Sequence, residues 1–315
     1  MLVISTITEL RARLGGERTI AFVPTMGNLH EGHFNLMRLA REHGSCVVVS
    51  IFVNPLQFGP GEDFERYPRT LEADCAKLQG LVDVVFAPLA NEMYPVQQTV
   101  FVEPPPVANE LCGAARPGHF RGMATVVLKL LNIVQPQVAL FGKKDYQQLH
   151  IIRQLVAQLN LPVRIVGGET VRAADGLALS SRNQYLSATE RSEAVFLYPV
   201  LQGMRLAILQ GERNFERLRQ QAVETLAARG WSVDYVAVRN QSDLQPASDT
   251  LLAQPAVCGR RRGDGIPAPT ACAHRVMPSA SPAQGDPVQC ELVILAAARL
   301  GNTRLLDNIE VCLTN

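Results

Sequence analysis

The sequence predicts an α/β protein with a parallel sheet in its N-terminal part and a smaller α+β domain after it. Short, uninterrupted apolar runs rich in Val and Ile alternate with helical stretches in the first half, as in right-handed βαβ units with strands buried on both faces. Near residue 176 this alternation ends, and two helical runs precede a strand with alternating polarity. We therefore expect one domain over residues 1–176 and a second over residues 177–315.

The expected elements follow the order that this class requires. In the first half the runs predict strands at 19–23, 46–53, 82–88 and 138–142, and helices at 30–43, 69–81, 121–134 and 144–160. In the second half they predict helices at 188–210 and 214–230, and strands at 232–240 and 291–301. The first domain is thus Rossmann-like, and such sheets bind ligands at the carboxyl ends of their strands.

Residues 247–290 do not fit this pattern. They are rich in Pro, Gly, Ala and Arg and have no apolar periodicity, so we expect an atypical, disordered insertion in the second domain. A lineage-specific loop and an out-of-frame translation flanked by in-frame sequence both fit this composition. A zinc site built from Cys258, Cys272, His274 and Cys290 is disfavoured because their spacing matches no common pattern.

Composition excludes several classes of protein. The 315 residues carry a net charge of +1, which argues against a nucleic-acid-binding surface. No apolar run approaches the roughly 18–20 residues that span a bilayer, and the N-terminus lacks the basic region of a signal peptide. The seven scattered cysteines form no CxxC pair and indicate reduced thiols in the cytoplasm.

The stretch PTMGNLHEGH follows the first strand and contains the first candidate site. Pro24 ends the strand, and Gly27 allows a tight turn. Asn28 is a suitable helix N-cap, with Glu31 three residues later in a box-like capping pattern. These residues predict a helix that begins near Leu29.

His30 and His33 fall in the first turn of that helix, on one face and with Gly32 between them. Free N–H groups and the positive dipole end at a helix start favour anions, so the pair predicts a phosphate site that Gly32 leaves open to a nucleotide. Surface or cap-bound histidines are the plain alternative. A zinc-protease site is disfavoured because it needs histidines four residues apart.

Two later turns have the same character. Gly142 ends a strand, and Lys143, Lys144 and Asp145 open the next helix, where a lysine can contact phosphate and an aspartate can accept hydrogen bonds from ribose. Taken alone, this turn would be read as helix capping with two solvated lysines.

The other turn, DGLALSSRN, places Ser180, Ser181 and Arg182 side by side. Two hydroxyls, adjacent backbone N–H groups and a guanidinium fork suit a polyphosphate. Taken alone, it is only a polar turn.

Together these segments resemble the pantoate–β-alanine ligase (pantothenate synthetase) family of the nucleotidyltransferase superfamily. The similar motifs cover nearly all of the chain except 247–290 and are VPTMGNLHEGH, SIFVNPLQFGPGEDFERYPRT, RPGHFRGMATVV, ALFGKKDYQQ, DGLALSSRNQYLS and LAAARLGNTRLLDNIEV. The resemblance implies an ATP-dependent ligase that makes pantothenate. Pantoate and ATP would give pantoyl adenylate and pyrophosphate, and β-alanine would then displace AMP. Mg²⁺ on the phosphates, a cytoplasmic location and a homodimer are implied as well.

The resemblance also implies roles for single residues. Catalysis would fall to His33, with His30 and Lys144. ATP would contact Met26, Gly27, Asn28, Leu29, His30, Glu31, Gly32, His33, Gly142, Lys143, Lys144, Asp145, Val171, Leu179, Ser180, Ser181 and Arg182. Gln57 and Gln148 would bind pantoate, with Asn54 as a helper, and Gln57 would also lie near β-alanine. No direct protein ligand to a metal is expected.

Two further points concern this family pattern. Leu179 stands where the family usually has methionine, a volume-conserving change that we expect to be harmless. The loop NPLQFGPGEDFERYP carries two glycines and is expected to act as a lid against water. An adenylyltransferase that stops at a nucleotide product, and a nucleotide-binding protein without turnover, remain as alternative functions.

Overall fold

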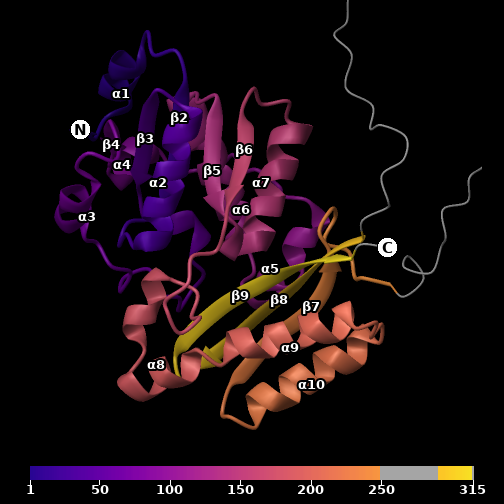
Figure 1. The fold of residues 1–315 in the computed structure, drawn as a ribbon. Coiled ribbons are helices and arrows are strands. Elements are labelled where there is room, and N and C mark those ends of the chain that lie inside the picture. The colour runs from indigo at the N-terminus through magenta and orange to yellow at the C-terminus, as the bar shows by residue number, and fades with distance from the viewer. Residues whose placement is uncertain (249–289, 314–315) are drawn as a thin grey trace, which may run out of the picture.

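The computed structural model describes residues 1–248 and 290–313, which form two layered units (Figure 1). The predicted insertion at 247–290 therefore falls almost entirely outside the described residues, as do Cys258, Cys272 and His274. Within the described ranges, no helix combines the length and apolarity needed to cross a membrane.

The larger unit is built on a six-stranded parallel sheet. Its strands are β1 Leu2–Ile4, β2 Ile20–Thr25, β3 Cys46–Ile51, β4 Val84–Phe86, β5 Val138–Gly142 and β6 Arg164–Gly168. Their order across the sheet is β1-β4-β3-β2-β5-β6. The chain runs outward from β2 through β3 to β4 and later returns to place β5 on the other side of β2. The strand order thus reverses between β2 and β5, the position at which such sheets bind ligands.

Helices cover both faces of this sheet. The α-helices are α1 Ile7–Leu14, α2 Glu31–His43, α3 Leu71–Leu78, α4 Ala90–Met93, α5 Cys112–Ala115, α6 His119–Val134 and α7 Tyr146–Gln158. Short 3-10 turns lie at η1 Pro55–Gln57, η2 Pro106–Asn109, η3 Lys143–Asp145 and η4 Ser181–Tyr185.

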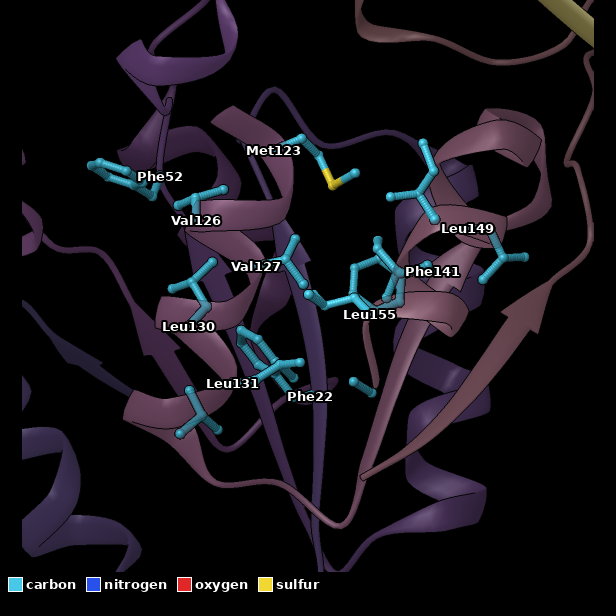
Figure 2. Close-up of a cluster of buried hydrophobic side chains, with 14 of the residues drawn as sticks. Phe22, Phe52, Met123, Val126, Val127, Leu130, Leu131, Phe141, Leu149 and Leu155 are labelled. Carbon is cyan, nitrogen blue, oxygen red and sulfur yellow. The ribbon is translucent and has the colours of Figure 1, made fainter. Parts of the chain in front are cut away.

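Successive residues of the central strands fill two separate cores. Phe22 of β2 faces α6 and α7 in the cluster of Figure 2, which also includes Met123 and Phe141. Ala21 and Val23, its neighbours along the strand, belong to the other core together with α2 and α3. This burial on both faces explains why the strand sequences are uninterrupted apolar runs.

The smaller unit has helices α8 Ala188–Ala194, α9 Leu197–Leu209 and α10 Phe215–Ala227 and strands β7 Ser232–Asn240, β8 Cys290–Leu300 and β9 Thr303–Leu313. The strands form an antiparallel sheet in the order β7-β8-β9, with α9 and α10 along one face (Figure 1). Ile294 of β8 packs with these helices, whereas Val293 and Leu295 join the core of the larger unit. The middle strand is thus buried on both faces, and its sequence is correspondingly apolar.

The predicted fold class is confirmed, and the strands expected at 138–142 and 232–240 have these bounds. The single helix expected at 188–210 is wrong: it divides into α8 and α9 around Val195 and Phe196. Pro199 gives the reason, because it has no N–H for the carbonyl one turn earlier and is tolerated only in the first turn of a new helix. Sequence reasoning missed β1, α1, α4, α5, β6 and β9, of which β1, α4 and α5 are only three or four residues long.

Candidate active site

The turn after β2 differs from its predicted form. His30 is the N-cap of α2, and the helix begins at Glu31, so the assignment of Asn28 as the cap was wrong. Asn28 lies in the left-handed region with φ 51°, before the cap. The buried carboxylate of Asp74 accepts the N–H groups of Asn28 and Leu29, both at 2.8 Å, and so fixes the turn from outside.

His30 and His33 cap the helix together. The Gly32 N–H donates to Nδ1 of His30 at 3.2 Å, and the His30 N–H donates to Nδ1 of His33 at 3.3 Å. An accepting Nδ1 has no proton, so each neutral ring carries its proton on Nε2. The ring centroids are 4.1 Å apart. The site therefore offers two adjacent Nε2–H donors.

The charge state of this pair follows from its surroundings. Burial, His33 and Lys144 lower the pKa of His30 to about 3, and burial above all lowers the pKa of His33 to about 4. Both rings are therefore neutral donors near pH 7. A Cβ at Gly32 would lie 2.9 Å from Cε1 of His30. The glycine hence makes room for the histidine ring itself, in addition to any nucleotide.

The turn after β5 contributes a lysine and an aspartate. Lys144 and Asp145 both line the cavity described below. Burial alone would raise the pKa of Asp145, but the nearby charges of Lys144 and Arg182 outweigh it and lower that pKa. In contrast, the Lys143 ammonium binds Glu169 at 2.6 Å and Glu310 at 2.8 Å.

Strand β9, which belongs to the smaller unit, forms hydrogen bonds to the turn that contains Lys143 and Lys144. Nδ2 of the buried Asn308 donates to the carbonyls of Lys143 and Lys144, at 2.9 and 2.8 Å. Next to it, Arg172 forms a fork with Asp307 at 2.7 and 2.8 Å. The position of Lys144 therefore depends on a strand more than 160 residues away in the sequence.

The SSRN turn closes against the histidine turn. Oγ of Ser181 donates to the Asn28 carbonyl at 3.1 Å, and Oγ of Ser180 caps the Arg182 N–H. The Arg182 guanidinium makes a two-bond contact with Asp63, at 2.9 and 2.9 Å. Burial opposes ionisation of Asp63, but the bonds to Arg182 lower its pKa below the ordinary value. Arg182 is thus charged and held by the loop that was predicted to be a lid.

Gln57 follows β3 in η1 and is buried. Its Oε1 accepts from Nδ2 of Asn54 at 3.1 Å, and its Nε2 lies 3.1 Å from the sulfur of Met26. Asn54 is itself buried and accepts from the Tyr94 hydroxyl at 2.7 Å. Gln148, the other predicted pantoate residue, lies on α7 and lines the same cavity.

One cavity of about 690 Å³ between the two units unites most of the predicted residues. Its lining includes Met26, His30, Gly32, His33, Asn54, Gln57, Gly142, Lys144, Asp145, Gln148, Val171, Leu179, Ser180, Ser181 and Arg182. Gly27, Asn28, Leu29, Glu31 and Lys143 are the predicted residues that lie outside this lining. Leu29 is in the core, and Glu31 forms an exposed pair with Arg38.

Sequence reasoning missed several residues that shape the site. Asp63, Arg116 and His119 line the cavity, whereas Asp74 supports it from outside. Their motifs GEDFERYP and RPGHF had drawn attention only as resemblances. Asp74 lies four residues before the buried Leu78, on the same face of α3, and a charged residue on a core-facing helix position is the signal that could have identified a buried carboxylate.

The loops after three neighbouring parallel strands, β3, β2 and β5, carry Gln57, the histidine pair and Lys144 to one place. A parallel sheet with neutral histidines at a helix start and a lysine in the turn after the adjacent strand is typical of nucleotide-binding α/β proteins, and here a second unit closes the cavity.

Comparison with known proteins identifies the family. The model of the family described as pantoate–β-alanine ligase matches residues 2–262, and the chain belongs to this family. Pantothenate synthetase from Nitrosospira multiformis is 54% identical over 313 residues, covering 99% of this chain and 98% of the relative. The corresponding protein from Chromobacterium violaceum is 53% identical and covers 99% of both.

Solved structures of pantothenate synthetases are similar to this chain over nearly its whole length. Pantothenate synthetase from Thermus thermophilus superposes with a TM-score of 0.81 at 42% identity, covering 98% of this chain and 99% of that one. Pantoate–β-alanine ligase from Francisella tularensis, complexed with beta-gamma ATP and β-alanine, has a TM-score of 0.72 at 32% identity, covering 98% and 97%.

Proposed function

We propose that this protein condenses pantoate with β-alanine to pantothenate in an ATP-dependent reaction through pantoyl adenylate, releasing AMP and pyrophosphate. Family membership supports the reaction. The structural observation that supports it best is a single cavity lined by His30, His33, Lys144, Gln57 and Gln148, which combines phosphate-binding groups with neutral amides for a hydroxy acid.

In the first step the pantoate carboxylate attacks the α-phosphorus of ATP. We assign His30 and His33 to the phosphate oxygens on which charge develops, because their Nε2–H groups are adjacent and already oriented by the helix backbone. Lys144 adds a positive charge on the same phosphates. No covalent enzyme intermediate is needed, so positioning and charge stabilisation would account for the rate.

The remaining nucleotide contacts are assigned by place in the cavity. Asp145 would accept hydrogen bonds from ribose, and the Val171 backbone would contact adenine. Ser180 and Ser181 would close over the phosphates, where Arg182 would exchange Asp63 for phosphate oxygens.

In the second step the β-alanine amine attacks the acyl carbonyl and AMP leaves. Gln57 would lie near both acid and amine, and Gln148, which lines the same cavity from α7, would also bind the acid. The Asp63-containing loop would keep water from the adenylate, since hydrolysis would waste ATP.

Mg²⁺ is proposed as the partner of the ATP phosphates. The described part of the chain gathers no group of three or more His, Cys, Asp or Glu side chains able to hold a metal ion. We propose that phosphate oxygens and water would hold the ion, which suits the hydration preference of Mg²⁺ and would neutralise phosphate charge.

We also propose a cytoplasmic homodimer. The dimer rests on the family resemblance, and the compartment rests on the use of ATP and on the free state of Cys46, Cys75, Cys112 and Cys312. Light scattering during size exclusion would give twice the 34.4 kDa chain mass. A monomer at micromolar concentration would refute the dimer.

The decisive experiment measures AMP, pyrophosphate and pantothenate from ATP and pantoate, with and without β-alanine. The wild type should form pantothenate only when β-alanine is present. His33→Ala should lower turnover about 10³-fold because it removes a donor to the developing charge. Pyrophosphate without amide would indicate an adenylyltransferase, and ATP binding without turnover would indicate a binding protein.

A further inference from the structure

His119 is a buried histidine to which the reaction proposed above gives no role. It is the first residue of α6, its side chain lines the cavity, and it is only 9% exposed. Its Nδ1 lies 2.8 Å from the Gln57 carbonyl oxygen, and its Nε2 lies 3.0 Å from Nη1 of Arg116. Both ring nitrogens are therefore engaged.

The two partners determine the tautomer. A guanidinium can only donate, so Nε2 of His119 accepts from Arg116; a carbonyl can only accept, so Nδ1 donates to Gln57. The ring must be neutral to do both. Burial, aided by the charge of Arg116, lowers the pKa of His119 to about 4, in agreement with a neutral ring.

Arg116 is itself fixed. Its Nε and Nη2 donate to the two carboxylate oxygens of Glu62, at 2.8 and 2.5 Å. Hydrogen bonds thus run without interruption from Glu62 through Arg116 and His119 to the backbone of Gln57. The close approach of α6 to η1 supports them: a Cβ at Gly122 would lie 1.9 Å from the Leu56 carbonyl oxygen.

Hydrogen bonds also orient the side chain of Gln57. The Leu56 N–H donates to Oδ1 of Asn54, which identifies the Asn54 oxygen and leaves Nδ2 to donate to Oε1 of Gln57. Nε2 of Gln57 is then the atom left over, and among the residues that the structure describes its one partner is the weakly accepting sulfur of Met26 at 3.1 Å. Gln57 therefore has a donor ready for a substrate oxygen.

We propose that His119 is a positioning residue that, by holding the Gln57 carbonyl, fixes the Gln57 amide as a hydrogen-bond donor to an oxygen of the acid substrate. This proposal rests on the pantoate-binding role proposed for Gln57. It assigns His119 to recognition of the acid, with no part in nucleotide binding.

Two substitutions of His119 distinguish the hydrogen bond of Nδ1 from that of Nε2. In His119→Asn the side-chain amide can occupy the place of Nδ1 and still donate to Gln57. In His119→Gln the amide reaches the place of Nε2 and contacts Arg116. The Gln57 carbonyl then loses the 2.8 Å bond from the ring and keeps only the longer contact of 3.4 Å from Nη2 of Arg116. His150→Gln is the matched control, because His150 is similarly buried at 8% exposure and lies on α7 outside the cavity lining.

We expect His119→Gln to raise the KM for pantoate about tenfold, the loss of one well-placed hydrogen bond, with little change in the KM for ATP. His119→Asn should stay within about threefold of the wild type, and His150→Gln should leave both constants unchanged while lowering the melting temperature. Equal KM values for pantoate in the Asn and Gln variants, or a larger effect on ATP, would overturn the proposal.

A crystal structure of His119→Gln provides a readout that does not depend on activity. The Gln57 peptide and amide should be displaced from their wild-type positions. An unmoved Gln57 would contradict the positioning role even in an active enzyme. Conversely, a displaced Gln57 together with a wild type that makes no pantothenate would refute the proposed reaction and leave the positioning role intact.

Discussion

Two groups of polar residues at the cavity are held in place in different ways. In the glutamine corner (Asn54, Gln57, Tyr94, Arg116 and His119), side chains fix one another through hydrogen bonds. In the histidine corner (His30, His33, Lys144 and Asp145), the backbone orients the rings. Among residues 1–248 and 290–313, the Lys144 ammonium takes part in no ion pair or hydrogen bond.

The ligands proposed for the two corners account for this difference. A triphosphate brings its own charge, so a lysine that is already paired would first have to lose its partner. A small hydroxy acid offers few contacts, and binding it selectively requires donors whose direction is set beforehand. Arg182 lies between the two cases because it is charged but held by Asp63.

Adjacent lysines give the largest expected contrast. Lys144→Ala should lower kcat/KM about 10²- to 10³-fold, because it removes an unpaired charge from the phosphates. Lys143→Ala should cost much less, since Lys143 is already bound to Glu169 and Glu310. Pyrophosphate release measures both. Equal losses of kcat/KM in the two variants would contradict the distinction between a lysine that is already ion-paired and one that is not.

Gln57→Glu should have the next largest effect. It keeps the size of the side chain but replaces the Nε2 donor with a carboxylate oxygen that repels an acid. We expect the KM for pantoate to rise about 10²-fold, with ATP affinity nearly unchanged. Initial rates at saturating ATP measure the first constant and calorimetry measures the second. A loss confined to ATP affinity would contradict the role of Gln57 in pantoate binding.

Asn308→Ala tests how far the histidine corner depends on the smaller unit. Without the two donors to the Lys143 and Lys144 carbonyls, we expect the KM for ATP to rise about tenfold. Cys312→Ser is the control, since Cys312 is an exposed residue of the same strand. An unchanged KM for ATP in Asn308→Ala would show that β5 and α7 position the turn by themselves.

The smallest effect concerns pH. Because the pKa of His33 is lowered to about 4 in the folded protein, the unfolded chain binds more protons between about pH 6.5 and 4. The contribution of His33 to stability is therefore complete above about pH 6.5 and is lost as the pH falls toward 4. Between pH 7 and 5.5 this loss should be about 1 kcal/mol.

His33→Gln removes the titrating group, and glutamine at this position can still take part in a capping box. Urea unfolding at the two pH values should show a weaker pH dependence in this variant than in the wild type. An identical pH dependence would mean that His33 does not carry the linkage.

Periodicity and motif spacing were enough to predict four of the six strands of the larger sheet, its principal helices and the residues at the carboxyl ends of the central strands. They failed where the deciding contact was distant in the sequence. Asn28 is a residue type that commonly caps helices, but its N–H donates to Asp74, and His30 is the N-cap instead. Strand β9 was missed because its alternation is irregular: one face contacts the helices and the other contacts the larger unit.

The sequence alone determined the α/β class, the family and the turns that meet in the cavity, because apolar periodicity and turn residues act over a few positions and motifs keep their order. Only the tertiary structure decided which groups are free and which are held. Lys143 and Lys144 are indistinguishable as neighbours in a sequence, yet Glu310 binds one and Asn308 orients the turn of both. Glu310 and Asn308 lie more than 160 residues away from these lysines, and local patterns do not encode such distant partners.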